Sequence, residues 1–365
     1  MARVITFLGK GGVGRTTIAI AAAKQLSQQG SRVLLASSDT SPAFGILLGA
    51  TVGSEPQSIG ANLSAVQLFS TVLLEKVWEE VKQVEARYLR SPILKNVYGQ
   101  ELSLVPGMDG ALNLYAIREY DTSGQYDVIV YDGAGDSSML HAFGVPESAS
   151  WYIRRFRQVF IESDLGQTIS PFVQPVTAAV LNTSWSFNDL TEEPTREATS
   201  VLKEGKDAVS DPNRVAAYVV TTPDAAAIAT AKYLWGSAQQ TDLTVAGVLW
   251  NRAEIDPAAA AEFAPLAVSA LPECAGEDWQ PLIDALPNLR ATANVPQPIS
   301  IDVAARQAKV FLPSFDKKQV KLTQYGPEVT VEAGDRRRNI DLPPQLRGQA
   351  VKGAKFQDGY LIISF

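Results

Sequence analysis

The chain is poor in the residues that build disulfide frameworks and zinc sites. Its 365 residues include one cysteine, Cys274, and one histidine, His141. A single thiol cannot form an intramolecular disulfide, and one cysteine with one histidine cannot complete a structural zinc site. The sequence therefore excludes a disulfide framework and predicts no zinc site within one chain. So few thiols also fit a reducing compartment, and we expect a cytoplasmic protein.

Long apolar runs and an excess of positive charge are missing as well. No run is long enough for a transmembrane helix, so no integral membrane segment is expected. The first apolar run, Val4–Leu8, is too short for the core of a signal peptide. Lys and Arg number 32 against 39 Asp and Glu, which gives a formal net charge of -7. That balance argues against a nucleic-acid partner, which usually requires a basic surface.

What the sequence does contain is a regular alternation of strand-like and helix-like segments. Helical spacing marks Thr16–Ser27 and Val72–Arg90. Short apolar runs typical of buried strands are Val4–Leu8, Arg32–Ser37, Leu63–Leu68, Tyr126–Asp132, Val215–Thr222, Thr244–Asn251 and Pro265–Leu271. This alternation predicts an α/β fold with a doubly wound, mostly parallel sheet.

Two regions depart from the alternation. Residues 150–211 have helical stretches with scattered aromatics, and we interpret them as a helical insertion on a larger α/β domain spanning 1–295. From residue 296 onward, short strand-like runs alternate with turn signals. We expect residues 296–365 to form a small all-β sandwich.

A glycine-rich loop follows the first predicted strand and precedes the first predicted helix. Such a loop lets successive backbone N–H groups point at one spot, where the helix N-terminus adds partial positive charge. Thr16 sits where a hydroxyl would coordinate Mg²⁺. The predicted phosphate-binding residues are Gly9, Lys10, Gly11, Gly12, Val13, Gly14, Arg15, Thr16 and Thr17. A glycine-rich turn without a ligand is the alternative.

Two basic residues give this loop its character. Arg15 stands after the last glycine, where a P-loop normally has lysine. Arginine keeps the charge but is larger and forked, so we expect nucleotide binding to persist and γ-phosphate transfer to be affected. Lys10 lies in the early part of the loop, as in a deviant form of the motif.

Three polar residues at predicted strand ends complete the candidate site. Asp39 could orient an attacking water, although its sequence also fits a turn or helix cap. Asp132 ends an apolar strand and is typical of a Walker B acid that binds Mg²⁺ through water. Asn251 could read the adenine edge, or it could be a turn residue.

These features together resemble the ATPases of arsenite pumps and of guided entry of tail-anchored membrane proteins. The resemblance covers roughly residues 1–290. Further matching stretches are Asn62-Leu63, Pro106–Leu112, Tyr126–Asp132 and Leu271–Glu277. The C-terminal segment resembles an α-crystallin or small-heat-shock domain, through Leu312–Lys318, Arg337–Pro343 and Phe356–Leu361.

The resemblance implies a homodimer with two sites for ATP and Mg²⁺ at its interface. Lys10 would reach the partner's phosphates, and Asp39 would activate water as part of switch I. Asp132 would open switch II. Asn251, with Pro272 and Glu273, would hold the adenosine. The helical insertion would form a groove for a client protein.

The chain departs from the family in ways that matter for function. It cannot supply the zinc pair of the eukaryotic targeting branch or the cysteines that bind metalloid in the arsenite pump. Its switch II reads Asp132-Gly133-Ala134-Gly135-Asp136 instead of the usual Asp-Thr-Ala-Pro. We therefore expect a dimeric, Mg²⁺-dependent ATP-hydrolysing switch that handles a hydrophobic or unfolded client. The alternative is a nucleotide-responsive scaffold with little turnover.

Two further features have plainer interpretations. The run Arg336–Arg338 fits a solvated turn leading into a strand better than an anion-binding patch. His141, shortly after the switch II segment, fits a structural or surface role better than a sensor of the nucleotide.

Overall fold

The computed structural model describes residues 1–88, 107–162, 200–274, 276, 278–291 and 295–365. An eight-stranded sheet forms the centre, in the order β3-β4-β2-β5-β1-β6-β7-β8. Its strands are β1 (Arg3–Leu8), β2 (Val33–Ser37), β3 (Gln57–Gly60), β4 (Leu63–Gln67), β5 (Val128–Asp132), β6 (Val215–Thr221), β7 (Val245–Asn251) and β8 (Val268–Leu271). Every neighbouring pair is parallel except β3–β4. The predicted doubly wound, mostly parallel sheet is confirmed.

Helices cover both faces of this sheet, because its central strands are apolar on both sides. In β1, Val4 and Leu8 belong to one buried cluster, whereas Ile5 and Phe7 belong to the other. The first cluster includes residues of α4, α5 and α8, and the second includes residues of α1, α2 and α10. The helices are α1 (Arg15–Gln28), α2 (Pro42–Leu48), α3 (Ser70–Tyr88), α4 (Met108–Thr122), α5 (Ser137–Glu162), α8 (Ala225–Gln239), α9 (Pro257–Ala261) and α10 (Gln280–Ala285).

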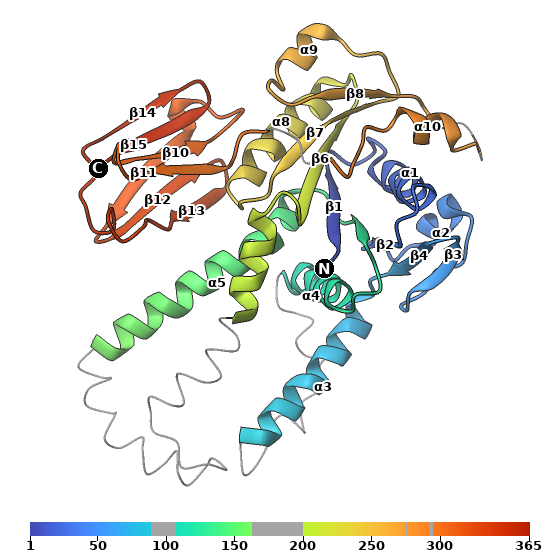
Figure 1. Cartoon of the computed structure of the whole chain (residues 1–365), viewed down its shortest axis with the longest axis horizontal. Coiled ribbons are helices and arrows are strands. Elements are labelled where there is room, and N and C mark those ends of the chain that lie inside the picture. The colour runs from blue at the N-terminus through green and yellow to red at the C-terminus, as the bar shows by residue number, and fades with distance from the viewer. Residues whose placement is uncertain (89–106, 163–199, 275, 277, 292–294) are drawn as a thin grey trace.

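The helical insertion expected over 150–211 is described only at its two ends. Helix α5 begins at Ser137, well before the expected start, and leads away from the sheet (Figure 1). Residues 200–210 are helical and return the chain to β6. Residues 163–199, which make up most of the expected insertion, lie outside the described part of the chain. Among the described helices, none has the length and apolar character needed to cross a bilayer.

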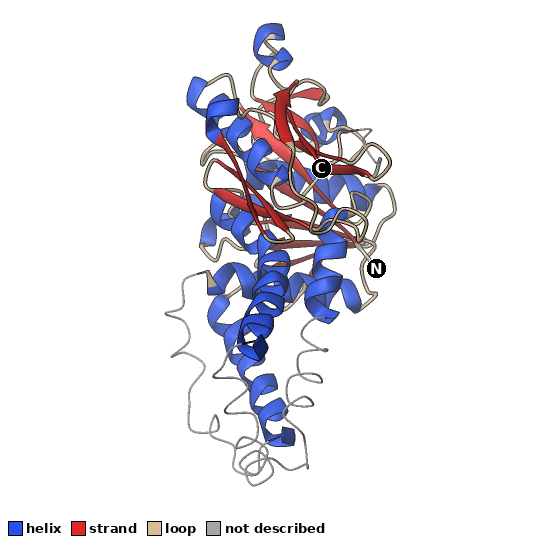
Figure 2. Cartoon of the chain, turned by 90° about the vertical axis from the view of Figure 1, so that its left-hand side faces the viewer, coloured by secondary structure: helices blue, strands red, loops and turns tan. Residues whose placement is uncertain are grey.

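The C-terminal part is all-β, as predicted. One sheet has the order β14-β15-β10-β9 and the other β11-β12-β13, with antiparallel pairing throughout. This part lies to the left of the central sheet in Figure 1, so its strands are toward the viewer in Figure 2, which is seen from that side. Residues of both sheets, including Val310, Val331 and Ile363, form one buried cluster. The strands are β9 (Ile299–Asp302), β10 (Gln307–Phe311), β11 (Val320–Tyr325), β12 (Glu328–Ala333), β13 (Arg336–Ile340), β14 (Gly353–Gln357) and β15 (Tyr360–Ser364), with a 3₁₀ turn at Lys317–Gln319.

The expectation of a solvated turn at Arg336–Arg338 is wrong. Arg336 and Arg338 are buried, with 8% and 4% of their surfaces exposed. Both side chains reach the ATPase part of the chain. Arg336 donates to the backbone carbonyl of Ser137, and Arg338 pairs with the carboxylate of Asp242. No sequence pattern indicated these contacts, because the residues that accept the bonds are distant along the chain.

Candidate nucleotide-binding site

The glycine-rich loop leaves the end of β1 and runs directly into α1. Gly12 and Gly14 have positive φ values of 87° and 94°, and Gly14 caps the N-terminus of α1. A Cβ atom on Gly14 would lie 2.4 Å from Nδ2 of Asn251, so a larger residue would push the loop away from β7. The backbone N–H of Gly9 donates to the carbonyl of Gly135 at 2.9 Å. The loop is therefore held by strand ends and by the switch II segment.

Asp132 is the buried centre of the site. It ends β5 and is 4% exposed. Its carboxylate accepts a hydrogen bond from the hydroxyl of Ser37 at 3.0 Å and another from Thr16 at 3.3 Å. Burial raises the pKa of Asp132 to about 6, while the Ser37 and Thr16 hydroxyls and the charge of Arg15 oppose that rise. The structure thus brings together Thr16 and Asp132, the two residues that the sequence assigned to Mg²⁺.

Ser37 is a site residue that the sequence analysis missed. It lies opposite Asp132 in the β2–β5 register and is fully buried. Besides donating to Asp132, its hydroxyl accepts a hydrogen bond from the backbone N–H of Asp39 at 3.2 Å. The available signal was a hydroxyl residue at the end of a buried apolar strand.

Asp39 follows β2 at the same edge of the sheet. One of its carboxylate oxygens accepts a hydrogen bond from the backbone N–H of Ser41 at 2.8 Å, so the turn role that its sequence also fits is present. The side chain of Gln67 donates to the carbonyl of Asp39 at 2.8 Å. The charge of Asp39 helps to raise the pKa of Asp132, which places the two acids within electrostatic reach. Its role toward water stays a prediction.

Arg15 points at the switch II loop. Its Nη1 atom donates to the carbonyl of Ala134 and lies 3.4 Å from the carbonyl of Gly133. Burial lowers the pKa of Arg15, and the charges of Asp132 and Asp136 oppose this. Gly135 has a φ of 63°, and a Cβ atom there would lie 1.6 Å from Nη1. The guanidinium therefore occupies the space that the absent side chain of Gly135 leaves.

Lys10 has the opposite environment. It is exposed, and its backbone carbonyl accepts a hydrogen bond from Val13, but its side chain forms no hydrogen bond or ion pair with the residues that the structure describes. Gly11 and Gly12 beside it are also exposed, and a Cβ atom on either would meet nothing within 4 Å. The early half of the loop is thus open to a ligand or to another chain.

The ends of β7 and β8 bring the predicted nucleoside residues to the loop. The side-chain amide of Asn251, which is 4% exposed, donates to the carbonyl of Val13 at 2.8 Å. Asn251 pairs with Leu271 in the register, and the exposed residues Pro272 and Glu273 follow directly. In this structure Asn251 supports the phosphate loop, and its contact with adenine stays a prediction.

The residues present fit ATP and Mg²⁺. The loop has an open cradle of backbone with positive φ, which suits phosphate oxygens. Thr16 and Asp132 supply oxygen atoms, which Mg²⁺ prefers. Among the described residues no cluster of three or more His, Cys, Asp or Glu could hold a metal. That suits Mg²⁺, which usually keeps several waters and binds one or two protein groups together with substrate phosphates.

Several known proteins are similar in sequence to this chain. An uncharacterized protein of Streptomyces coelicolor is 26% identical over 392 residues, which cover 100% of this chain and 97% of that protein. A Chlorobaculum tepidum protein named "Putative arsenical pump-driving ATPase" is 32% identical over 157 residues, 43% of this chain and 39% of the relative. An "ATPase GET3" of Malassezia globosa is 27% identical over 168 residues, 46% of this chain and 47% of the relative. The chain thus aligns with less than half of the two relatives that are named as ATPases.

Two family matches divide the chain. Residues 305–365 match the HSP20-like domain found in ArsA, in agreement with the antiparallel C-terminal part. Residues 2–264 match the family described as anion-transporting ATPase, and they include the phosphate loop, both switch segments and Asn251. The chain therefore belongs to the anion-transporting ATPase family.

Proposed function

We propose that this protein is a dimeric, Mg²⁺-dependent ATPase that acts as a conformational switch on a hydrophobic or unfolded protein client. The observation that carries the proposal is the position of Asp132. It is hydrogen-bonded to Thr16 of the phosphate loop and to Ser37 at the end of β2, the strand that leads to Asp39 of switch I. The loop, both switches and the Mg²⁺ candidates thereby meet at one buried carboxylate.

The residues divide the work at such a site. Backbone N–H groups of the loop, with Thr17, would hold the phosphates, and Thr16 would hold Mg²⁺ directly while Asp132 holds it through water. Mg²⁺ neutralises charge on the phosphate oxygens when bound. Asp39 would orient the attacking water, and Pro272 and Glu273 would border the nucleoside.

Two exposed features support a homodimer. The side chain of Lys10 lies on the surface with no partner among the described residues. Helix α2, which follows Asp39, exposes two apolar side chains, with Ile46 78% and Leu47 45% accessible. A second copy would cover these side chains and give Lys10 a phosphate to bind.

The client is proposed from the arrangement of the helices. Helix α5 begins immediately after switch II and leads into residues 150–211, the range in which the family resemblance implies a client groove. Movement of switch II would therefore be transmitted along α5. The single cysteine of the chain argues against arsenite as the cargo.

Substitution Asp39→Asn tests the proposed chemistry. Asparagine can still accept the hydrogen bond from Ser41, so the turn is preserved while the negative charge is lost. We expect phosphate release from Mg-ATP to fall about 100-fold with an unchanged melting temperature. Equal turnover in the variant would remove Asp39 from the mechanism. Sedimentation with and without ATP, and omission of Mg²⁺, test the dimer and the metal requirement.

A second candidate function is a nucleotide-responsive scaffold with little turnover. It is favoured by Arg15, whose guanidinium is bonded to the switch II loop instead of being free to follow the γ-phosphate. Substitution Arg15→Lys separates the two functions. A large gain in the rate of phosphate release in Arg15→Lys supports a slow switch. Efficient ATP turnover in the parent protein would rule out the scaffold function.

The client proposal has its own experiment. The Asp39→Asn protein loaded with ATP is used to capture bound proteins, with nucleotide-free protein as the control. We expect proteins with exposed hydrophobic segments in the ATP-loaded sample. Recovery of abundant soluble proteins alone would count against client handling.

A further inference from the structure

The C-terminal domain is fixed to α8 by close apolar packing. The ring of Phe311 meets Trp235 edge-on, with centroids 5.8 Å apart, and Phe315 meets Tyr233 in the same way at 6.1 Å. A Cβ atom on Gly236 would lie 2.4 Å from the carbonyl oxygen of Pro313, so the two backbones touch. Phe311 belongs to the same buried cluster as Trp235 and the central sheet. This contact is tightly packed, and we call it the α8 anchor.

Arg338 strengthens the α8 anchor. It donates to the carbonyl of Gln239 at 2.8 Å, at the last residue of α8, and it pairs with Asp242 just beyond the helix. A cation at the C-terminal end of a helix is favourable, because the unpaired carbonyls there carry partial negative charge. Arg338 is thus held in place by its hydrogen bond to Gln239, by its ion pair with Asp242 and by the partial negative charge of the helix end.

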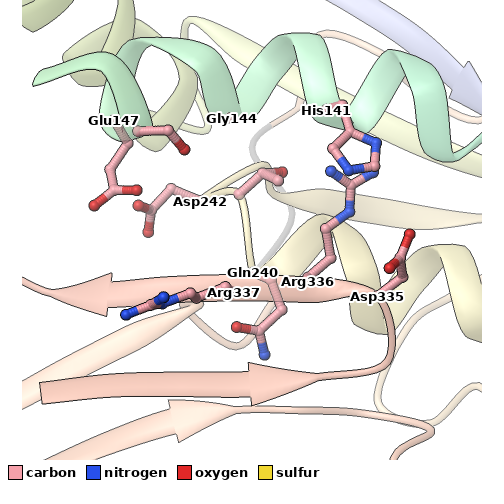
Figure 3. A pocket seen from close by; sticks show the side chains of 10 residues that line it. His141, Gly144, Glu147, Gln240, Asp242, Asp335, Arg336 and Arg337 are labelled. Carbon is pink, nitrogen blue, oxygen red and sulfur yellow. The ribbon is translucent and has the colours of Figure 1, made fainter. Parts of the chain in front are cut away.

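The contact with α5 is of a different kind. Arg336 reaches across from β13 and donates to the carbonyl of Ser137 in the first turn of α5. Arg337 lies over the ring of Trp151, farther along the same helix, at 5.8 Å from its centroid. Between them is a cavity of about 240 Å³, lined from α5 by His141 and Glu147 among others. Figure 3 shows Arg336 pointing up to α5 beside His141. Because the α5 contact consists of a few polar interactions around a cavity, it permits movement that the closely packed α8 anchor does not.

The position of Ser137 gives this contact its significance. Switch II, from Asp132 to Asp136, leads directly into Ser137. The Asp136 carboxylate accepts hydrogen bonds from the backbone N–H groups of Ser138 at 2.8 Å and Met139 at 3.3 Å, which ties the end of switch II to the start of α5. Arg15 holds the other part of the same loop. Two arginines from distant parts of the chain therefore hold switch II, one at each end.

Electrostatics make the Arg336 contact easy to break. The N-terminus of a helix carries partial positive charge and disfavours a nearby cation. The carboxylates of Asp136 and Asp335 offset this, since both raise the pKa of Arg336 against the lowering that burial causes. A shift of Asp136 during nucleotide binding would remove part of that compensation.

We propose that Arg336 is a positioning residue for ATP hydrolysis, through which the C-terminal domain restrains switch II. The α8 anchor supplies a fixed base, and the bond from Arg336 to Ser137 holds the first turn of α5 in the arrangement of this structure. Release of that bond lets switch II and α5 move together. This inference rests on the proposed ATPase function.

Steady-state kinetics of the full-length protein test this role. In Arg336→Ala we expect kcat for ATP to rise about threefold or more, with KM for ATP unchanged, because the restraint acts on movement and not on binding. Arg336→Lys retains one donor and should stay near the parental rate. Arg338→Ala, on the same strand, should lower the melting temperature without raising kcat. A gain in rate cannot come from structural damage, so an unchanged or lower kcat in Arg336→Ala overturns the proposal.

Hydrogen exchange distinguishes failure of this inference from failure of the ATPase function. Without nucleotide, the backbone amides at residues 137–141 should exchange faster in Arg336→Ala than in the parent, while those of β12 are unchanged. A parent protein without turnover would remove the proposed function. Equal exchange at residues 137–141 would remove the restraint.

Discussion

The two basic residues of the phosphate loop share a charge and differ in everything around them. Lys10 is exposed, and its side chain contacts no described residue through a hydrogen bond or ion pair. Arg15 is partly buried, and its guanidinium is bonded to the carbonyls of switch II. The side chain of Lys10 is thus free of such contacts within the described part of the chain, whereas that of Arg15 is held by the backbone of switch II.

The difference separates two tasks that one lysine performs in an ordinary P-loop. A lysine can move to the phosphates as a flexible point charge, whereas a forked arginine prefers a fixed set of acceptors. In this chain Arg15 fixes switch II, and the outward cation Lys10 remains to meet phosphate charge. The loop therefore combines an arginine bonded to switch II with an exposed lysine, which we propose serves a second copy of the chain.

Removing Lys10 is expected to have the largest effect. In Lys10→Ala, kcat should fall by about 100-fold or more, because a cation aimed at developing phosphate charge is lost. The melting temperature should not change, since the side chain is exposed. Calorimetry and a phosphate-release assay measure both quantities. Lys203→Ala, another exposed lysine, is the control. Full activity in Lys10→Ala would show that Lys10 does not act on the phosphates. The proposed division of tasks between Lys10 and Arg15 would then be wrong.

The second-largest effect is expected when the position of the Arg15 guanidinium is disturbed. Gly135→Ala places a Cβ atom 1.6 Å from Nη1 of Arg15, at a backbone φ of 63°. We expect a loss of about 2–3 kcal/mol in the free energy of unfolding, from strain and from displacement of the guanidinium. Chemical denaturation measures it.

Gly124→Ala is the matched control for this change. Gly124 has a similar φ of 66°, but a Cβ atom there meets nothing within 4 Å. Its cost should be about 1 kcal/mol, the backbone part alone. The double variant Gly135→Ala with Arg15→Ala should recover part of the loss. Equal costs at the two glycines would mean that Arg15 is not held against switch II.

The smallest effect is expected at the support of the loop. In Asn251→Asp the donor to the Val13 carbonyl is lost and a carboxylate faces that oxygen. Nucleotide affinity should fall about tenfold, as one buried hydrogen bond is worth about 1–1.5 kcal/mol. Titration with a fluorescent nucleotide measures it. Asn288→Asp keeps its acceptor role toward Arg290 and should bind normally. Unchanged nucleotide affinity in Asn251→Asp would show that the phosphate loop does not depend on this hydrogen bond.

Much of the fold followed from the sequence, because buried parallel strands have continuous apolar runs. The strand runs of the central sheet and most of those in the C-terminal part are confirmed. Strands β3, β9 and β14 were missed, since each lies at the edge of its sheet and β3 and β14 are largely exposed. Helix α5 begins earlier than expected because Asp136, a residue of switch II, caps it.

The sequence by itself determined the phosphate loop, since its glycines, Thr16 and the adjoining strand and helix act over a few neighbouring residues. It also indicated Asp132 as a strand-end acid. Only the tertiary structure decided that Ser37 bonds to Asp132, that Arg15 is bound to switch II and that Arg336 reaches Ser137. These contacts join residues far apart in the chain. Local periodicity carries no information about them, because strand order and domain docking determine which side chains meet.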